Sequence, residues 1–524
     1  MLMTLRIQHL YRWFTHSAKE QDLKPRQLLR WDLVFYDGDE FDYVVIGAGA
    51  AGSAVAARLA LAGHSVLLVE AGGDPNILTR IPGATLALTG SNLDWYYDTI
   101  PNNKSCLSSK GGKCRLSRGR CLGGSTSLNY MMYTRGNKQD YDFNVTGWNW
   151  EDIKPYFLRF EGLQEPSRLP KSSGAYHNTS GITPIGYFGD SGNPWHQRIV
   201  EGLTSVNFPY NPDVNSKSQI GVSKILGFTS GGERVSTATA YLGHGMSDHV
   251  LPIINVRVDH DSMPSSNILS IGSKLWQGLS WLLMRSGPLA SNSITDLTAF
   301  ANTECYDFKL RRLLNDRPEC ELPNLQLIYA YIDKGLLSMV KSLYEIAAPH
   351  SPEVMNQVVS ANEESSFIVV SPVVLKPKSR GWVKLASSDP FEQPAIIPNY
   401  LSDKRDVEEM VRAIKLLEQV VETPAFKNFN ASILKLHISE CPAFDEEGYW
   451  ECYSRHMTHS VQHAVGTAAL GQVVDERLRV KGVKNLRIAD ASVLPHLPRG
   501  NTAAAIIAIG ERLSDFLLQD RGLE

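Results

Sequence analysis

Between residues 42 and 70 the spacing of apolar positions changes from the period of a strand to that of a helix and back. Residues 42–46 are a short β-branched run, and an alanine-rich stretch beginning near residue 50 continues to Gly63, where a helix is expected to end. A second β-branched run, residues 65–70, ends at Glu70. This order predicts a strand, a crossover helix and a second, parallel strand.

Further elements follow along the chain. Residues 325–332 and 367–375 have the β-branched and aromatic content of strands. Residues 406–421 form an amphipathic pattern, whose apolar positions share one helical face: Val407, Met410, Val411, Ile414 and Leu417. We find no internal repeat.

The carboxyl end repeats the strand-to-helix pattern. Residues 486–490 are predicted to form a strand that ends in an acid, Asp490. After a proline-containing loop, Asn501 can cap a helix that runs from Thr502 to about Leu518. The small residues of its first turn leave the amino terminus open to a phosphate or a flat ring.

The turn after the first strand has the spacing G-x-G-x-x-G. Gly47 allows the tight turn, Gly49 lets the backbone approach a pyrophosphate, and Gly52 permits close helix–strand contact. Glu70 can accept hydrogen bonds from the adenosine ribose. Because strand, helix, second strand and acid stand in order, we predict a dinucleotide site rather than a structural glycine turn, although this motif does not separate FAD from NAD.

The composition excludes several classes of protein. The 52 Lys and Arg residues nearly balance the 55 Asp and Glu residues, which leaves a formal charge of −3 and no electrostatic case for a nucleic-acid partner. At 524 residues and 43% hydrophobic residues the chain is too apolar to be disordered as a whole, and it is long enough for about two to four domains.

The amino terminus shows no convincing signal peptide, because basic residues interrupt the apolar positions throughout residues 1–30. Ile7, Leu10, Tyr11 and Phe14 fall on one helical face, so a transit peptide or a surface-lying amphipathic helix is an alternative to a plain extension. The longest apolar stretch elsewhere, around residues 275–284, is shorter than the roughly 20 residues that cross a bilayer, and we expect no transmembrane segment.

Six of the seven cysteines fall in three close pairs and leave Cys121 unmatched: Cys106 with Cys114, Cys305 with Cys320, and Cys441 with Cys452. The pairs permit local disulfides, but spacing does not establish connectivity, and reduced thiols are the alternative.

Glycosylation sequons at Asn103, Asn144, Asn178 and Asn430 fit a secreted route without establishing one. His456 and His459 have the spacing of metal ligands, but no acid or cysteine completes the set, so no metal site is expected.

These segments together resemble the glucose–methanol–choline oxidoreductases, which are FAD-dependent enzymes that oxidise alcohols. The resemblance rests on four segments: residues 42–70, the Arg-Gly-x-x-Leu-Gly-Gly-Ser-Thr-x-Leu-Asn-Tyr stretch at 118–130, Gly147-Trp148 with Tyr156-Phe157, and the ending from His463 to Thr502. It looks closest to the insect glucose-dehydrogenase-like branch, because of residues 449–452 and the cysteine pairs.

The resemblance implies an α/β composite fold, in which a Rossmann-like FAD-binding domain is interleaved with a substrate-binding domain built on a largely antiparallel sheet. The implied segments are an extension over 1–40, FAD-binding parts over 41–145, 226–249 and 465–524, and substrate-binding parts over 146–225 and 250–464.

The resemblance also implies the chemistry. A small alcohol, whether sugar, steroid or fatty alcohol, meets the flavin beside His463 and Asn501. An imidazole, whose unperturbed pKa is about 6.5, can accept the hydroxyl proton, and Asn501 can donate a hydrogen bond to the developing alkoxide. The cofactor contacts implied beyond the first turn are Gly123, Gly124, Ser125 and Asn129 along the flavin, and Asp490 and Thr502 near the pyrophosphate and ribityl chain. For Asp490 a helix cap or an ion pair is the alternative. The sequence does not identify the electron acceptor.

One departure from the family pattern follows Leu242, where a long stretch that supplies another strand of the FAD-binding domain is missing. Only five residues separate Leu242 from Asp248 and His249. Its loss exposes sheet edges and leaves the adenosine side of the cofactor poorly covered, so we expect weakened FAD affinity or poor folding. The alternative to an enzyme is therefore a flavin-poor, non-catalytic relative that acts as a binding or regulatory protein; an NAD-dependent dehydrogenase is disfavoured by the flavin-like segments.

Overall fold

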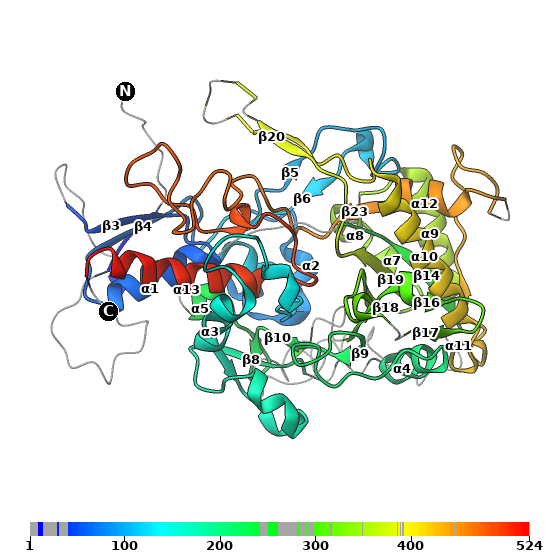
Figure 1. Cartoon of the computed structure of the whole chain (residues 1–524). Coiled ribbons are helices and arrows are strands. Elements are labelled where there is room, and N and C mark those ends of the chain that lie inside the picture. The colour runs from blue at the N-terminus through cyan, green and yellow to red at the C-terminus, as the bar shows by residue number, and fades with distance from the viewer. Residues whose placement is uncertain are drawn as a thin grey trace.

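The computed structural model places two sheet-based halves side by side, with α1 and α13 in one half and α9, α10 and α12 in the other (Figure 1). It describes residues 9–13, 29–30, 40–189, 191, 193, 195–240, 250–259, 281, 290–291, 297–314, 317–347, 349–384, 386–387, 389, 392–444 and 446–522. The shortened junction at 242–249 and most of the amino-terminal segment lie outside the described residues.

The first half is Rossmann-like and confirms the predicted strand–helix–strand unit. β3 (Tyr43–Ile46) and β4 (Val66–Glu70) pair in parallel and are joined by α1 (Ala50–Leu61). Helix α1 ends where the chain turns through Gly63, whose φ of +90° suits glycine. Its alanines are buried because they pack closely under the sheet and against α13 (Ala503–Gln519), where a Cβ on Gly510 would lie 2.6 Å from the Cα of Ala51.

Two amino-terminal strands extend this sheet. β1 (His9–Trp13) pairs antiparallel with β4, and β2 (Leu29–Arg30) pairs with β1, giving the order β2-β1-β4-β3. The alternative of an amphipathic helix here was wrong for residues 9–13, which instead pair with the edge of β4, where a surface helix would leave the outward backbone groups of β4 without partners.

The second half is built on an antiparallel sheet, as the family resemblance implied, and the described residues form eight strands of it. Its main path is β22-β14-β19-β18-β15-β9, and β13 and β23 pair beside β19. The strands are β9 (Gly221–Lys224), β13 (Val250–Pro252), β14 (Ile254–Val258), β15 (Leu297–Ala301), β18 (Leu325–Ile332), β19 (Ser366–Val374), β22 (Ser432–Ile433) and β23 (Thr458–Ser460). The strands expected over 325–332 and 367–375 correspond to β18 and β19.

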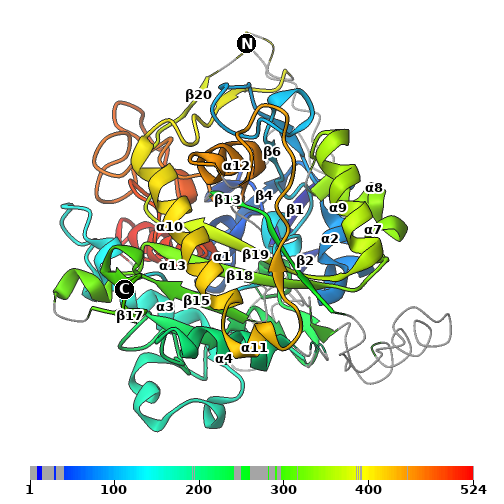
Figure 2. The ribbon, with the colours of Figure 1, turned by 90° about the vertical axis from the view of Figure 1, so that its right-hand side faces the viewer.

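Helices cover one face of this sheet, the face away from α1 and α13 (Figures 1 and 2). They are α4 (Trp195–Ser205), α9 (Pro352–Glu364), α10 (Lys404–Val421), α11 (Pro424–Lys427) and α12 (Tyr449–Met457). The apolar face predicted for residues 406–421 is the buried face of α10, where Ile414 and Leu417 pack in one core with Leu325 and Leu327 of β18.

Alternation along the strands turns the intervening residues to the other face, toward the Rossmann-like half. On β15 and β18 these residues are Thr298, Phe300, Gln326 and Ile328. Phe300 and Ile328 belong to a small apolar cluster with Met132 and Val461, which come from the segments that join the two halves. This face of the sheet therefore forms a wall opposite the Rossmann-like half.

The remaining elements connect or flank these layers. Helix α3 (Trp150–Phe160) packs beside α1 and α13, and the buried carboxylate of Glu511 on α13 accepts hydrogen bonds from Arg58 of α1 and Arg159 of α3. The short strands and helices are β5 (Tyr97–Asp98), β6 (Arg115–Leu116), β7 (Glu161–Leu163), β8 (Thr183–Tyr187), β10 (Leu226–Gly227), β11 (Thr229–Ser230), β12 (Glu233–Arg234), β16 (Tyr306–Asp307), β17 (Arg312–Leu313), β20 (Trp382–Lys384), β21 (Ala395–Ile397), α2 (Thr85–Leu88), α5 (Thr237–Ala240), α7 (Leu336–Met339) and α8 (Lys341–Ala347).

The strand predicted over 486–490 is absent, and that prediction was wrong. Arg487 makes only an isolated bridge to Arg479, and Leu486 is 47% exposed. Among the described residues no strand pairs with the outer edge of β3, where Val44 is 57% and Ile46 82% exposed. A β-branched run forms a strand only beside a hydrogen-bonding neighbour, and the described chain provides none between β3 and residues 486–490.

The covalent cross-links follow the cysteine spacing. Cys106–Cys114, Cys305–Cys320 and Cys441–Cys452 are disulfides, and Cys121 is a buried free thiol. Burial raises the pKa of Cys121 to about 12, so the thiol stays protonated at neutral pH. Within the described part of the chain, no helix is long and apolar enough to cross a membrane.

Candidate cofactor and active site

One cavity of about 1580 Å³ runs from the glycine-rich turn to the carboxyl-terminal segments. Six of the predicted cofactor residues line it: Gly47, Gly49, Gly52, Glu70, Ser125 and Asp490. Ala464, the neighbour of His463, lines it as well. The early nucleotide motif and the segment that follows His463 therefore border a single space, although His463 and Asn501 are not themselves among the residues that line it.

The first turn is shaped to receive a phosphate. Gly47 has φ +88°, and a Cβ placed on it would meet nothing within 4 Å, whereas a Cβ on Gly52 would lie 2.2 Å from the carbonyl oxygen of Gly47. Helix α1 begins at Gly49 with no side-chain cap and no acidic residue in its first turn. Its first amide groups and the positive end of its dipole are thus left for an anion, and the turn fits the pyrophosphate of a dinucleotide.

Glu70 stands at the end of β4, beside this turn. Its two carboxylate oxygens accept hydrogen bonds from the backbone N–H of Ala48, at 2.9 Å, and of Gly72, at 3.0 Å. Burial raises the pKa of Glu70, and these backbone donors lower it in part. Each oxygen keeps a further lone pair, so the carboxylate can still accept a ribose hydroxyl.

The second glycine turn packs against the first loop. Gly123 has φ +87°, and a Cβ on Gly119 would overlap the backbone of Gly124, so this close approach requires glycine. Ser125 Oγ accepts a hydrogen bond from Gly119 N at 3.2 Å and faces the cavity. Gly123 and Gly124 stand behind Ser125 and are not among the residues that line the cavity.

Asn129 and Asp490 have structural partners of their own, and Thr502 begins the last helix. Asn129 Oδ1 accepts hydrogen bonds from Met131 N and from Arg234, a buried residue whose pKa burial lowers to about 9. Thr502, rather than Asn501, is the N-cap of α13, and it makes no side-chain cap, so the predicted cap at Asn501 was wrong. Asp490 caps the short helix 491–493 through Ser492 N and also lines the cavity, so the alternative role as a cap is observed together with the predicted position.

The two predicted catalytic residues lie together. Asn501 Nδ2 is 3.4 Å from Nε2 of His463, and both side chains are half-buried. An imidazole and a carboxamide at this separation can share one small polar group, the imidazole as a proton acceptor and the amide as a hydrogen-bond donor.

Thr134 holds the loop before α13 that carries Asn501, and we call this contact the Thr134 clamp. The backbone N–H of Asn501 donates to Thr134 Oγ1 at 2.6 Å, and Gly500 approaches so closely that a Cβ there would lie 2.5 Å from the same oxygen. Arg499 is fixed by Asp140, whose buried carboxylate accepts from both its backbone N–H and its guanidinium at 2.5 Å. Lys376, from the antiparallel half, completes this ion cluster at 2.7 Å from Asp140.

A second clamp holds His463 through the residue before it. Gln462 has φ +70°, an uncommon conformation outside glycine. Its side chain accepts from Ser117 N at 2.6 Å and donates to the carbonyl oxygen of Arg115 at 3.1 Å. Arg118 donates to the Gln462 carbonyl oxygen at 3.3 Å, so residues 115–118 orient the segment that carries His463.

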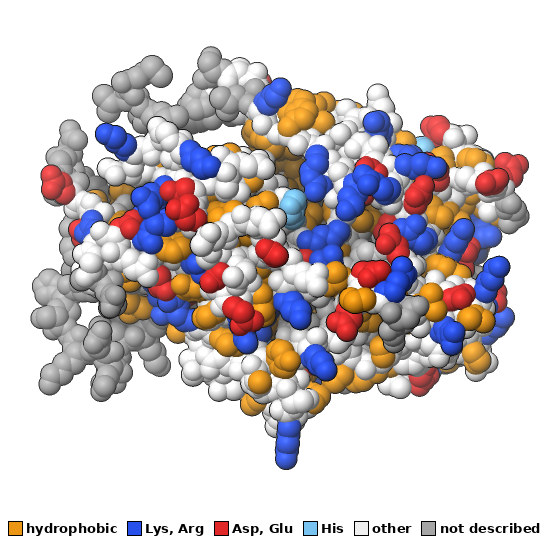
Figure 3. Space-filling view, viewed as in Figure 1, with side chains coloured by type: hydrophobic (Ala, Val, Ile, Leu, Met, Phe, Trp, Pro, Cys, Tyr) orange, Lys and Arg blue, Asp and Glu red, His pale blue; other side chains and the backbone are white. Residues whose placement is uncertain are grey.

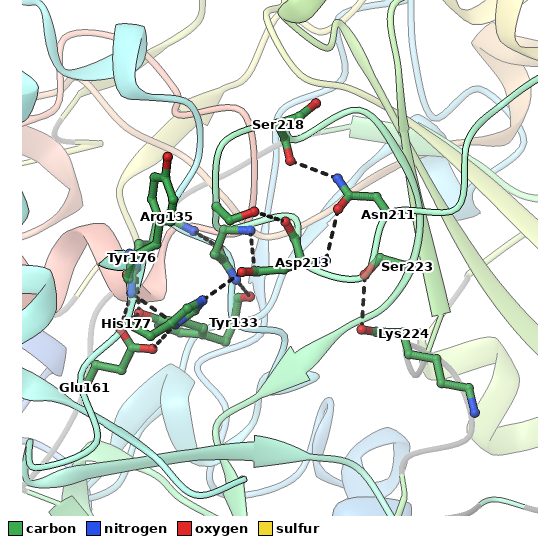
Figure 4. A network of polar contacts seen from close by, with 12 residues as sticks. Tyr133, Arg135, Glu161, Tyr176, His177, Asn211, Asp213, Ser218, Ser223 and Lys224 are labelled. Atoms are coloured by element: carbon green, nitrogen blue, oxygen red, sulfur yellow. Dashed lines mark hydrogen bonds and ion pairs between the residues drawn. The ribbon is translucent and has the colours of Figure 1, made fainter. Parts of the chain in front are cut away.

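Behind Thr134 lies a buried charge network that links several segments (Figure 4). Arg135 and His177 both contact the carboxylate of Glu161, and His177 Nε2 lies 3.0 Å from Asp213. Burial alone lowers the pKa of His177, but its hydrogen bonds to Asp213 and Glu161 outweigh burial and raise it. The network thus joins one guanidinium and one imidazole to two acidic side chains, and it immobilises Tyr133 and Arg135 on either side of Thr134.

Sequence reasoning missed the residues that position the pair. Thr134 and Gln462 stand next to recognised motifs, but a lone Thr or Gln carries no local signal. The clustering of Glu161, His177 and Asp213 could not be predicted either, because nothing in the sequence shows that they are buried together. Gln326, a strand residue of the other half, lies 3.5 Å from Asn501 Oδ1.

The histidines considered for metal binding have other surroundings. His456 Nδ1 lies 3.0 Å from Ser108 Oγ, and the sulfur atoms near His456 are those of the Cys441–Cys452 disulfide, which cannot act as thiolate ligands. His459 packs edge-to-face against His350 in the interior. On the outer face shown in Figure 3, basic and acidic side chains are interspersed, in keeping with the small net charge.

Comparison with known proteins gives matches over most of the chain. Two family models described as GMC oxidoreductase match, the amino-terminal model over residues 41–260 and the carboxyl-terminal model over 377–510. Ecdysone oxidase of Bombyx mori is 30% identical over 93% of this chain and 83% of its own length. Glucose dehydrogenase [FAD, quinone] of Drosophila melanogaster is 29% identical over 90% of this chain and 86% of its own.

Among solved structures, a formate oxidase of Aspergillus oryzae superposes with a TM-score of 0.75 at 21% identity, and the match covers 93% of this chain and 100% of that chain, which supports the fold. The alignment with the B. mori enzyme is 558 positions long but contains 93% of the 524 residues here, which is about 487 residues. About 70 positions of the relative therefore have no counterpart in this chain, in agreement with a missing internal stretch.

Proposed function

Because the chain belongs to the GMC oxidoreductase family, we propose that it oxidises an alcohol with His463 as the general base and Asn501 as the donor to the developing alkoxide. The enzyme is an FAD-dependent oxidoreductase acting on alcohols. The observation that carries the assignment of roles is the 3.4 Å separation of Asn501 Nδ2 from His463 Nε2.

The residues that fit the cofactor are those of the cavity. The uncapped start of α1 and the open position at Gly47 would hold the pyrophosphate, Glu70 the ribose, and Ser125 and Asp490 the remainder of the dinucleotide. When bound, the flavin supplies the acceptor for the hydride that leaves the alcohol carbon.

The residues of the chain supply the proton chemistry. A hydroxyl placed against His463 gives its proton to Nε2, and the negative charge that develops on its oxygen is met by an N–H of Asn501. Both groups are backed by rigid supports, Thr134 behind Asn501 and Gln462 beside His463, so little reorganisation is needed when charge develops.

The surroundings of the pair support an alcohol with an apolar body. Phe300 and Ile328 flank Gln326 on the wall of the sheet, and Val461 precedes His463 by two residues; all three belong to one apolar cluster. Phe300 is fully buried and Ile328 is 9% exposed, and none of the three lines the described cavity, so the cluster forms an apolar interior beside the pair rather than a substrate surface. Together with the likeness to an ecdysone oxidase, this apolar interior is our reason for proposing a steroid-like or long-chain alcohol as substrate rather than a sugar.

The protein is proposed to work in an oxidising, extracellular compartment. Three disulfides support this location, since they persist where the environment is oxidising. Asn103, Asn144 and Asn430 are exposed and can accept glycans. A mass decrease of the secreted protein on enzymatic deglycosylation tests the proposal, and an unglycosylated protein retained in the cytosol contradicts it.

The activity is tested by anaerobic mixing of flavin-loaded protein with a sterol, a long-chain alcohol or glucose. Alcohol-dependent loss of flavin absorbance is expected with the apolar alcohols. His463→Ala is expected to slow bleaching by about 10²- to 10⁴-fold, the usual contribution of a positioned base. The matched control is His437→Ala, because His437 is an exposed histidine of a separate loop. Wild-type bleaching by the loaded His463→Ala variant contradicts the assignment, and faster bleaching with glucose contradicts the substrate class.

A further inference from the structure

Two buried polar residues stand on the wall that the antiparallel sheet presents to the Rossmann-like half. Thr298 on β15 is fully buried, and Gln326 on β18 is 1% exposed. In the antiparallel register Phe300 pairs with Gln326 and Thr298 with Ile328, so the two polar residues are diagonal neighbours between apolar ones. Burial of polar groups among apolar ones is unfavourable unless they are hydrogen-bonded, so their partners are informative.

The direction of each hydrogen bond can be assigned. The hydroxyl of Thr298 donates its single hydrogen to the carbonyl oxygen of Leu327 at 2.9 Å. It must therefore accept from Gln326, whose Nε2 lies 3.1 Å away. The second N–H of the same Gln326 nitrogen points to Asn501 Oδ1 at 3.5 Å.

This arrangement sets the orientation of the Asn501 amide. With Oδ1 engaged by Gln326, the Nδ2 group is the one that faces Nε2 of His463. A rotated Asn501 would place its own N–H groups against the N–H of Gln326. A donor directed at Nε2 requires a lone pair there, so His463 carries its hydrogen on Nδ1; when a substrate hydroxyl replaces this 3.4 Å contact, the same lone pair can accept the hydroxyl proton.

The orientation of the Gln326 amide leaves one of its buried polar atoms without a hydrogen bond. Its Oε1 is buried and has no hydrogen-bond partner among the described residues. Buried acceptors without partners are uncommon. Turning the Gln326 amide over would direct its oxygen at Asn501 Oδ1 and would remove the N–H that donates to the hydroxyl of Thr298. The Gln326 amide is thus held with its nitrogen toward the active site.

We propose that Gln326, held by Thr298, is a positioning residue that fixes the amide orientation of Asn501 and, through it, the base-competent tautomer of His463. The proposal rests on the proposed function of the His463–Asn501 pair. It makes the wall of the antiparallel sheet part of the proton-transfer apparatus, although neither residue receives the proton.

The test compares Gln326→Leu and Thr298→Val with wild type as flavin-loaded proteins. Gln326→Leu removes both donors, and Thr298→Val removes the acceptor while keeping the shape of the side chain. Each is expected to lower kcat about tenfold, the effect of one hydrogen bond, with KM little changed. The acid limb of the pH profile of kcat/KM is expected to move, because the lone pair on His463 Nε2 loses its fixed partner. Thr298→Ser keeps the hydroxyl and is expected to show the wild-type kcat and the wild-type pH profile of kcat/KM.

The control is Asn255→Leu on β14 of the same sheet. Asn255 is a buried amide without a hydrogen-bond partner among the described residues, so its loss changes the interior of the sheet but not the link to Asn501. Wild-type kcat and pH profile in Gln326→Leu overturn the proposal, as does an equal loss in Asn255→Leu. If Gln326→Leu does not fold, Thr298→Val decides. The proposed function is tested separately: full activity of His463→Ala would refute it, whereas the Gln326 and Thr298 variants test only the positioning role.

Discussion

The amide nitrogen of Asn501 lies 3.4 Å from Nε2 of His463, although 38 residues separate the two along the chain. Neither residue belongs to a regular element, and each is held by a different part of the molecule. Thr134 holds Asn501, and residues 115–118 hold Gln462 before His463. The distance between the two proposed catalytic groups therefore depends on these two sets of contacts.

The first prediction concerns the Thr134 clamp. Thr134→Val removes the acceptor of the Asn501 backbone N–H while preserving side-chain shape. A lost hydrogen bond of about 1 kcal/mol, together with a displaced Asn501, is expected to lower kcat roughly tenfold. Steady-state kinetics of the flavin-loaded variant measure it. Thr134→Ser retains the hydroxyl and should behave like wild type, and an unchanged kcat in Thr134→Val would show that the clamp is dispensable.

The second prediction concerns the buried charge network of Glu161. Glu161→Gln leaves Arg135 and His177 without their shared carboxylate and is expected to lower the free energy of unfolding by about 3–5 kcal/mol. The corresponding change in the partly exposed pair Arg80–Glu233, Glu233→Gln, is expected to cost less than about 1 kcal/mol. Chemical denaturation measures both. Equal effects would mean that burial of the network does not matter.

The same network predicts how stability changes above neutral pH. The folded-state pKa of His177 is raised, so the folded protein holds a proton that the unfolded chain releases near pH 6.5. This stabilisation is complete below about pH 6.5 and is lost as the pH rises through the raised value. His177→Gln should remove this part of the pH dependence of the unfolding free energy. A variant with the wild-type slope above pH 6.5 would exclude His177 as its source.

A third prediction concerns acid stability and the buried pair His350 and His459. Their rings lie 4.7 Å apart, and burial lowers the pKa of His350 and lowers that of His459 to about 4. The unfolded chain takes up these protons near pH 6.5, so the free energy of unfolding falls as the pH drops from 6.5 to 4. His459 alone contributes about 3 kcal/mol to the loss.

Thermal unfolding between pH 4 and 7 tests this prediction. His350→Leu loses no hydrogen bond of the described structure, because neither ring nitrogen has a partner there, and it should flatten the decline in Tm. His437→Ala, which changes an exposed histidine, should leave the decline unchanged. An identical decline in His350→Leu and wild type would contradict the assignment.

A fourth prediction concerns the open edge of β3. The N–H groups of Tyr43 and Gly47 donate to the β4 side, so those of Val44 and Ile46 point to the outer edge, which no described strand covers. Val44, Val45 and Ile46 of this strand also line the adjoining cavity, so the uncovered edge borders the space that would hold the cofactor. We expect FAD to bind less tightly than the retained motifs suggest; purified protein with stoichiometric, tightly bound flavin would contradict this.

The exposed edge is also expected to promote aggregation, since it offers unpaired backbone groups and apolar side chains. Val44→Lys places a charge there and should reduce light scattering on heating. Ile182→Lys, at an exposed apolar residue elsewhere, serves as the control. Equal improvement in the two variants would show a general effect of charge rather than one of the edge.

The local motifs were predictable from the sequence because their causes are local. The turn at Gly47 needs a positive φ, the alanines of α1 suit close packing, and the period of apolar residues in α10 follows from one buried face. The three disulfides also follow local spacing. Residues 486–490 show the opposite case: their composition suits a strand, but a strand also needs a neighbour, and the described chain does not supply one.

The sequence by itself determined the nucleotide turn, the two kinds of sheet and the identity of the histidine and asparagine near the carboxyl end. The tertiary structure alone decided that these two residues face each other, that Thr134 and Gln462 hold them, and that Gln326 reaches Asn501 from the opposite half. Backbone dihedral preferences and side-chain periodicity act over a few residues and can be recognised in a sequence. Hydrogen bonds between segments 38 to 367 positions apart arise only when tertiary packing brings those segments together.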